Sequence, residues 1–126
     1  GGGRVSNPDT GCTANFGLNV KYLKNGKPQG SVLYMEHCST GDTKLKGNVM
    51  QSVSIVGRTA VIIGKGPLNG VGNYGFRINV TDNGEPGSSD LFGLQITAPN
   101  GSVVPGYNFA PRTIDAGNIQ VPQNAK

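Results

Sequence analysis

Apolar and polar residues alternate with a period of two over several stretches of this chain. The clearest stretch is Tyr74–Thr81, where every second side chain is aromatic or β-branched and most side chains between are polar. Ala14–Lys24, Ser31–Cys38 and Leu91–Ala98 have a related pattern. Successive side chains of a strand point to opposite faces, so each stretch predicts a β-strand with one face buried. Ser31–Cys38 carries apolar residues on both faces, and we expect it to be covered on both sides.

Weaker patterns predict further short strands between these stretches. They are Thr43–Met50, Ser52–Ile55, Thr59–Gly66, a segment at Val103-Val104 that ends at Pro105-Gly106, and a last strand marked by Ile119 and Val121. Turn signals separate them, the strongest being Asn25-Gly26 and Asp82–Gly87. No segment has a helical period of 3.6 residues. The sequence therefore predicts an all-β fold, an antiparallel β-sandwich or jelly-roll-like barrel of about 8–10 short strands.

The length of 126 residues fits a single domain, which we expect to span residues 1–126. We expect residues 1–13 to form an N-terminal extension, because they are rich in Gly, Asn, Pro and Asp, and residues 122–126 to form a tail. The 21 glycines and 8 prolines mark many turns rather than disorder. The chain has no run of about 18 apolar residues that would predict a membrane-spanning helix.

Two cysteines, Cys12 and Cys38, indicate the compartment. In a cytosolic protein they would be two buried thiols, whereas in a secreted one they would form a disulfide. Two triplets that fit glycosylation acceptors, at Asn79 and Asn100, and the abundance of Gly, Asn, Ser and Thr favour secretion. We expect a secreted or cell-surface protein, and we interpret Gly1 as the start of a mature product whose signal has been removed.

The formal net charge of +4 does not predict a nucleic-acid partner. The 11 basic residues are scattered, and the densest group, Lys21–Lys27, contains one aromatic residue, Tyr22. Single-stranded nucleic acids are bound by basic grooves with several stacked aromatics. We therefore expect no nucleic-acid partner and no insertion into a membrane.

No motif predicts catalysis. The single histidine, His37, lies within a predicted strand and no G-x-S-x-G elbow is present. His37, Cys12 and Cys38 would give a zinc site at most three ligands, and only if the cysteines were reduced. A glycosidase needs two carboxylates across a cleft, and the chain also lacks Trp for sugar stacking. We expect no enzyme activity and no cofactor other than calcium.

Calcium has one candidate site, the turn after the strand Tyr74–Thr81. Asp82, Asn83, Glu85 and Asp90 would supply the hard oxygen ligands that calcium prefers. Their spacing differs from an EF-hand loop, and Asp, Asn and Gly are also common turn formers. Both interpretations stay open at this point.

Several motifs in one order resemble a family of uncharacterised bacterial extracellular β-modules. They are the glycines Gly1–Gly3, the stretch Ala14–Gly26, the stretch Asn69–Phe76, the Thr-Asp-Asn-Gly-Glu-Pro-Gly stretch within Val80–Gly87 followed by Asp90–Phe92, and Gly117–Gln120. Arg4 and the pair Cys12/Cys38 depart from the family pattern. The resemblance implies a secreted or surface-attached module and no known activity, so it assigns no catalytic residue.

Two functions remain open from the sequence. The first is a non-catalytic subunit that assembles with its own copies into a surface filament, pilus-like fibre or coat by strand addition, with Gly1–Thr13 and Ile114–Lys126 as candidates to cross into a neighbour. The alternative is an adhesion module that binds carbohydrate or a matrix protein through tyrosines. Its candidate contacts are Tyr22, Tyr34, Tyr74 and Tyr107.

Overall fold

Strand formation follows the alternation seen in the sequence. The structure is a computed structural model that describes residues 1–22, 28–83 and 90–119. The described residues form ten β-strands: β1 Gly2–Ser6, β2 Thr13–Tyr22, β3 Pro28–Cys38, β4 Gly41–Gly47, β5 Val49–Val56, β6 Thr59–Leu68, β7 Val71–Thr81, β8 Leu91–Thr97, β9 Val103–Thr113 and β10 Ala116–Asn118. No described residue belongs to a helix that is long and apolar enough to cross a membrane.

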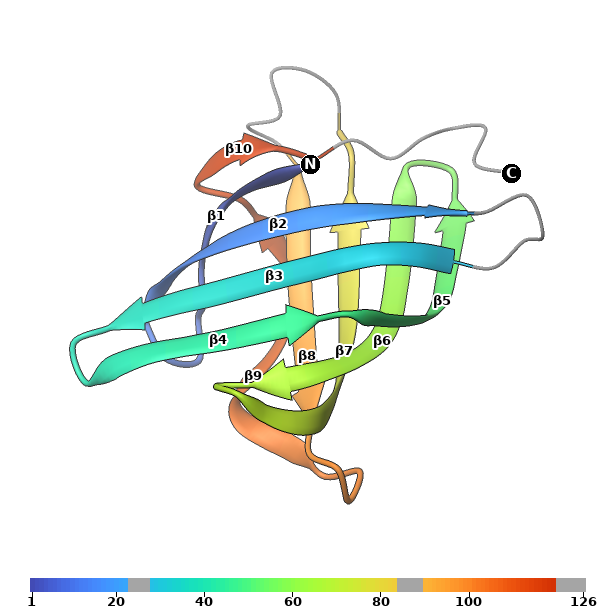
Figure 1. Ribbon diagram of the computed structural model, residues 1–126. Coiled ribbons are helices and arrows are strands. Elements are labelled where there is room, and N and C mark those ends of the chain that lie inside the picture. Colours follow the sequence, from blue (N-terminus) through green and yellow to red (C-terminus); the bar gives the residue numbers. More distant parts are fainter. Residues whose placement is uncertain (23–27, 84–89, 120–126) are drawn as a thin grey trace.

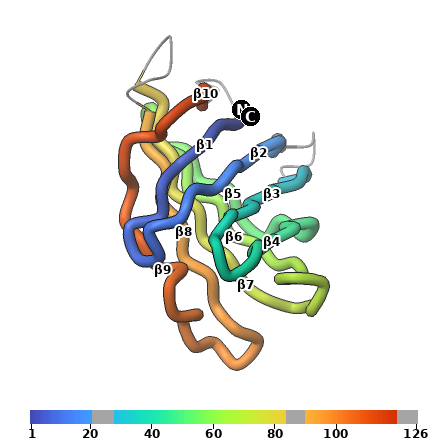
Figure 2. Tube along the Cα trace, turned by 90° about the vertical axis from the view of Figure 1, so that its left-hand side faces the viewer, coloured from blue at the N-terminus to red at the C-terminus, as the bar shows by residue number. Residues whose placement is uncertain are grey.

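All ten strands belong to one antiparallel sheet, which confirms the predicted all-β class. The order is β10-β1-β2-β3-β4-β6-β7-β8-β9, with β5 paired to β6 beside this path. Most neighbours in the sheet are neighbours in the chain, so the connectivity is a meander rather than the paired Greek keys of a jelly roll. The exceptions are β10, which returns to pair with β1 (Figure 2), and β5.

The sheet folds over itself to enclose the core. β2, β3 and β4 run across β6, β7 and β8 at a steep angle (Figure 1), as in orthogonal sandwiches. The two halves are joined at a narrow seam, where β4 and β6 share a single residue pair, Leu45 with Leu68. The side chains of the two inner faces meet in the space between the halves.

Aromatic side chains cross the space between the two halves. Phe92 of β8 stacks on Phe16 of β2, with ring centroids 4.3 Å apart, and lies 6.0 Å from Tyr34 of β3. Phe76, Ile78 and Val80 are also buried, as their alternation predicted, and half-buried Tyr74 packs against the core. Removing this apolar surface from water is the main stabilisation available to a chain with so few charges.

Several strand predictions were wrong in extent or in coverage. Residues 2–6 are not an extension, because β1 pairs with both β2 and β10. β9 continues through Pro105-Gly106 to Thr113, and β10 comes before Ile119. β3 is buried on one face only, since Leu33 is 40% exposed on the other. The hairpin predicted at Asn25-Gly26, the tail 122–126 and Val121 lie outside the described residues.

Candidate functional site

The disulfide predicted between Cys12 and Cys38 is present. Cys38 ends β3, and Cys12 precedes β2 by one residue. The register pairs Thr13 with His37, so the next step along the ladder brings the two cysteines together with Cα atoms 5.3 Å apart. This separation lies in the usual range for disulfides.

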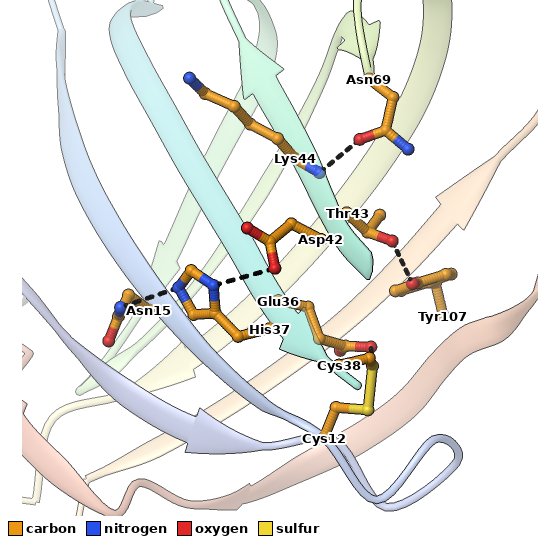
Figure 3. A network of polar contacts seen from close by, with 10 residues as sticks. All are labelled: Cys12, Asn15, Glu36, His37, Cys38, Asp42, Thr43, Lys44, Asn69 and Tyr107. Carbon is orange, nitrogen blue, oxygen red and sulfur yellow. Dashed lines mark hydrogen bonds and ion pairs between the residues drawn. A yellow bond between two sulfur atoms is a disulfide. The ribbon is translucent and has the colours of Figure 1, made fainter. Parts of the chain in front are cut away.

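A fully buried carboxylate, Glu36, lies beside the disulfide (Figure 3). Its Oε1 accepts hydrogen bonds from the Tyr34 hydroxyl at 2.7 Å and from Asn7 Nδ2 at 2.8 Å. Its Oε2 accepts a hydrogen bond from the Thr10 hydroxyl at 2.9 Å and lies 3.6 Å from Cys38 Sγ. Three donors therefore compensate the loss of water around the buried carboxyl group. We call Glu36 and these three donor residues the Glu36 network.

The pKa of Tyr34 lies far above the ordinary tyrosine value in the folded protein. Burial is the largest cause, and the hydrogen bond and the charge of Glu36 add to it. Burial also raises the pKa of Tyr107, whose hydroxyl donates to Thr43 Oγ1 at 2.8 Å (Figure 3). Both phenols are therefore neutral near neutral pH, and neither is poised to act as a base there.

Three residues of types that bind metal ions, Cys12, Glu36 and Cys38, lie together, with ligand atoms within 4.8 Å of one another. The thiolate is the form of cysteine that binds metal ions, and here both sulfurs are used in the disulfide. In the oxidised protein this cluster therefore offers one good ligand group, the Glu36 carboxylate. The network consequently acts as a structural tie between β3 and the segment before β2.

The residues proposed for calcium flank the connection from β7 to β8. Asp90 is fully buried, and its two carboxylate oxygens accept the backbone N–H of Asn83 at 2.8 Å and of Ile119 at 2.7 Å. Asp82 donates its backbone N–H to the Arg58 carbonyl. Glu85 lies outside the described residues. The visible role of Asp90 is to join the end of β7 to the segment after β10.

The two glycosylation candidates differ in their surroundings. Asn100 is exposed in the turn between β8 and β9, where its Oδ1 accepts hydrogen bonds from the backbone and hydroxyl of Ser102. Asn79 lies within β7 and is partly buried. Acceptor asparagines belong to exposed surface segments, so Asn100 fits this requirement better than Asn79.

The single histidine is exposed on the outer face of β3. Its Nδ1 lies 3.2 Å from Asp42 Oδ1, and its Nε2 lies 3.4 Å from Asn15 Nδ2 (Figure 3). A Ser-His-Asp arrangement would place a hydroxyl where Asn15 stands. The pair His37–Asp42 is 46% and 60% exposed, so it contributes little to stability.

The described tyrosines predicted as ligand contacts are partly or fully buried. Tyr34 is fully buried within the Glu36 network, and Tyr107 is half-buried against Thr43. Tyr74 is half-buried and packs against the core. The side chain of Tyr22 lies outside the described residues. A binding surface built on exposed tyrosines is therefore contradicted for Tyr34 and weakened for Tyr74 and Tyr107.

The strand β5, which lies beside the main path of the sheet, has one open edge in the described structure. Among the described strands, β5 pairs only with β6, so its other edge carries no ladder of hydrogen bonds. Its eight residues, Val-Met-Gln-Ser-Val-Ser-Ile-Val, contain no charge and no proline. Val49 and Val56 at its two ends are 52% and 76% exposed. Natural proteins usually protect such edges with charged residues, prolines or covering loops.

The edge of β9 is protected in the way that β5 is not. Asn7 Nδ2 donates to the Gly106 carbonyl at 2.8 Å, and Asp9 Oδ2 accepts the Asn108 N–H at 3.3 Å. β9 also contains two prolines and an arginine. β10 spans three residues. The contrast singles out β5 as the candidate functional element, a feature that sequence alternation alone could not identify.

Comparisons with protein-family models, with curated proteins and with solved structures find no match to this chain.

Proposed function

We propose that this protein is a non-catalytic, extracellular structural module that associates with its own copies by strand addition at β5. The observation that carries the proposal is the uncharged, unpaired edge of β5. A strand from a second copy would satisfy its free N–H and C=O groups with a backbone ladder. Exposed Val49 and Val56 would lose water at the same time.

The disulfide and the composition support the compartment in this proposal. A disulfide persists in oxidising surroundings such as the cell exterior. The formal net charge of +4 is small, so long-range repulsion between copies is modest. The resemblance to bacterial extracellular modules, carried by the motifs given above, points the same way.

Assembly through the chain ends is not part of the proposal. β1 and β10, which lie within the segments first considered for exchange, pair with each other inside this chain. Ile114 is buried. The ends described by the structure are therefore used in the module's own sheet, and among the described strands β5 has the least protected edge for a neighbour.

The geometry of the contact decides the size of the assembly. Pairing of β5 with β5 of a second copy is two-fold symmetric and closes as a dimer. Pairing of β5 with a different edge leaves one β5 free at each step, and it extends into a fibre unless the rotation between copies closes a ring. Sedimentation and electron micrographs distinguish a dimer from a filament.

The test adds charge to the edge without disturbing the core. Ser52→Lys combined with Ser54→Lys places two positive charges on exposed positions of β5. The control, Asn19→Lys combined with Ser31→Lys, adds the same charge at an exposed cross-strand pair of the inner strands β2 and β3. We expect light scattering to show association that rises with concentration for the wild type and the control, and a monomer for the β5 variant. A wild type that stays monomeric at millimolar concentration, with and without calcium, would refute the proposal.

A further inference from the structure

A polar hollow of about 360 Å³ lies on the outer face of β7, β8 and β9, away from the β5 edge. Arg77, Asn79, Gln95 and Asn108 line its polar part, and Pro111 lies at its apolar side. This volume is at the small end of the range for ligand pockets. The hollow takes no part in the assembly proposed above.

A break in strand pairing forms the hollow. Gly93 of β8 lies opposite Asn79 of β7, and the register between β8 and β9 shifts at this point. A side-chain carbon on Gly93 would lie 2.6 Å from the Pro111 backbone nitrogen, so only glycine lets β9 approach so closely. The absent side chain of Gly93 and the bulge together leave an open space beside Asn79.

The strand register then places donors in a row along the hollow. Arg77 is opposite Gln95, and Gln95 is opposite Asn108. Gln95 Nε2 donates to Asn108 Oδ1 at 3.3 Å. The second N–H of the Gln95 amide and the two N–H bonds of the Asn108 side-chain amide are left for other partners. The residues that line the hollow include one cation and no carboxylate.

One acceptor in the hollow is buried without a partner. Asn79 Oδ1 is shielded from solvent and makes no hydrogen bond to the described residues. A buried polar atom left in this state is unfavourable, and such an atom calls for a partner that completes it. A hydroxyl group of a ligand would supply the missing donor once the Asn79 side chain, which lines the hollow, turns this oxygen outward.

We propose that this hollow binds an anionic saccharide, a short segment that contains a uronic acid. The Arg77 guanidinium matches the geometry of a carboxylate with two parallel N–H donors. The amides of Gln95 and Asn108 donate to ring hydroxyl oxygens, and Asn79 Oδ1 accepts from a hydroxyl. Pro111 offers an apolar surface for the C–H face of the sugar ring.

The test is calorimetric titration of the intact protein with tetragalacturonate, an oligomer of uronic acids, and with cellotetraose, a neutral oligomer of equal length. We expect binding of tetragalacturonate and at least tenfold weaker binding of cellotetraose. Arg77→Gln should weaken tetragalacturonate binding at least tenfold, and Asn79→Asp, which has the same shape but adds a negative charge, at least as much. Gln95→Ala should weaken it about threefold or more, as expected for loss of a hydrogen bond.

The control removes an equal charge elsewhere. Lys46→Gln removes an exposed cation on β4 in the other half of the sheet and should leave the affinity unchanged. No binding of tetragalacturonate, or equal weakening by Lys46→Gln and Arg77→Gln, would overturn the proposal. Circular dichroism of each variant establishes that the fold is intact, and sedimentation in the same buffer measures association at β5 separately.

Discussion

At the scale of single residues, the Glu36 network holds the C-terminal end of β3 in place. Tyr34 donates the shortest of the three side-chain hydrogen bonds to the carboxylate. We expect Tyr34→Phe to lower the free energy of unfolding at pH 7 by about 1–2 kcal/mol, because Glu36 loses one donor while the ring stays. Urea denaturation measures the change. Tyr74→Phe, a substitution outside the network, is the matched control and should change it by less.

The effect of Tyr34→Phe should shrink at alkaline pH. The pKa of Tyr34 is raised in the folded protein, so above the unfolded tyrosine value of about 10 the unfolded chain releases a proton that the folded chain keeps. Stability then falls as pH rises, by about 1.4 kcal/mol per pH unit for this group. The phenylalanine variant lacks this term. A difference between the two proteins that stays constant from pH 9 to 11 would contradict the assignment.

The alternation along β3 predicts that Glu36 lies on the face with the buried apolar residues, but it does not predict the role of Glu36. Val32, Tyr34, Glu36 and Cys38 alternate along β3, so the carboxylate had to share a face with apolar residues. Its donors Asn7 and Thr10 come from a segment with no periodic signal, and only the folded chain brings them near. The disulfide was predictable because it depends on compartment and composition. The hollow at Asn79 was not, since it arises from a register shift.

At the scale of elements, the seam between β4 and β6 depends on a glycine. A side-chain carbon on Gly66 would collide with the Lys46 carbonyl oxygen, whereas one on Gly17 would meet no atom within 4 Å. We expect Gly66→Ala to destabilise the protein by about 1–3 kcal/mol, because the two strands must move apart. Gly17→Ala, also within a strand, should be neutral or stabilise by about 0.5–1 kcal/mol. Thermal unfolding of both variants measures the contrast, and equal effects would contradict this account of the seam.

The strands with strong alternation were predicted, and those stabilised by neighbours were not. β7 and β8 carry their own apolar face, so the sequence defined them closely. β1 has the sequence Gly-Gly-Arg-Val-Ser, and it forms a strand because β2 and β10 pair with its two edges. β9 passes through Pro105, which predicts a break, but proline is tolerated at the edge of a sheet. Tertiary pairing overrides local propensity in both cases.

At the scale of the whole molecule, the two ends of the sheet are joined through the segment between β1 and β2. The backbone N–H of Asp115, just after β9, donates to the Arg4 carbonyl of β1. Asn7 and Asp9 bond to the outer edge of β9, and Cys12 bonds to Cys38 of β3. The segment therefore ties three parts of the fold, and the disulfide is its covalent anchor.

Loss of the disulfide should therefore act beyond its own position. The bond joins residues separated by 26 in sequence, and removing it should cost about 3 kcal/mol on the loop-entropy model. Cys12→Ser combined with Cys38→Ser, and wild type treated with a phosphine reductant, should both show this loss in urea denaturation. Since the freed segment no longer holds Asn7 and Asp9 against β9, amide exchange should accelerate at Asn108, whose N–H faces Asp9. Exchange at Ile78 in the central strand β7 should follow only the global change in stability. If Asn108 keeps its protection while Cys38 loses its partner, the segment is held by its hydrogen bonds alone, and the disulfide anchors β3 without closing the sheet.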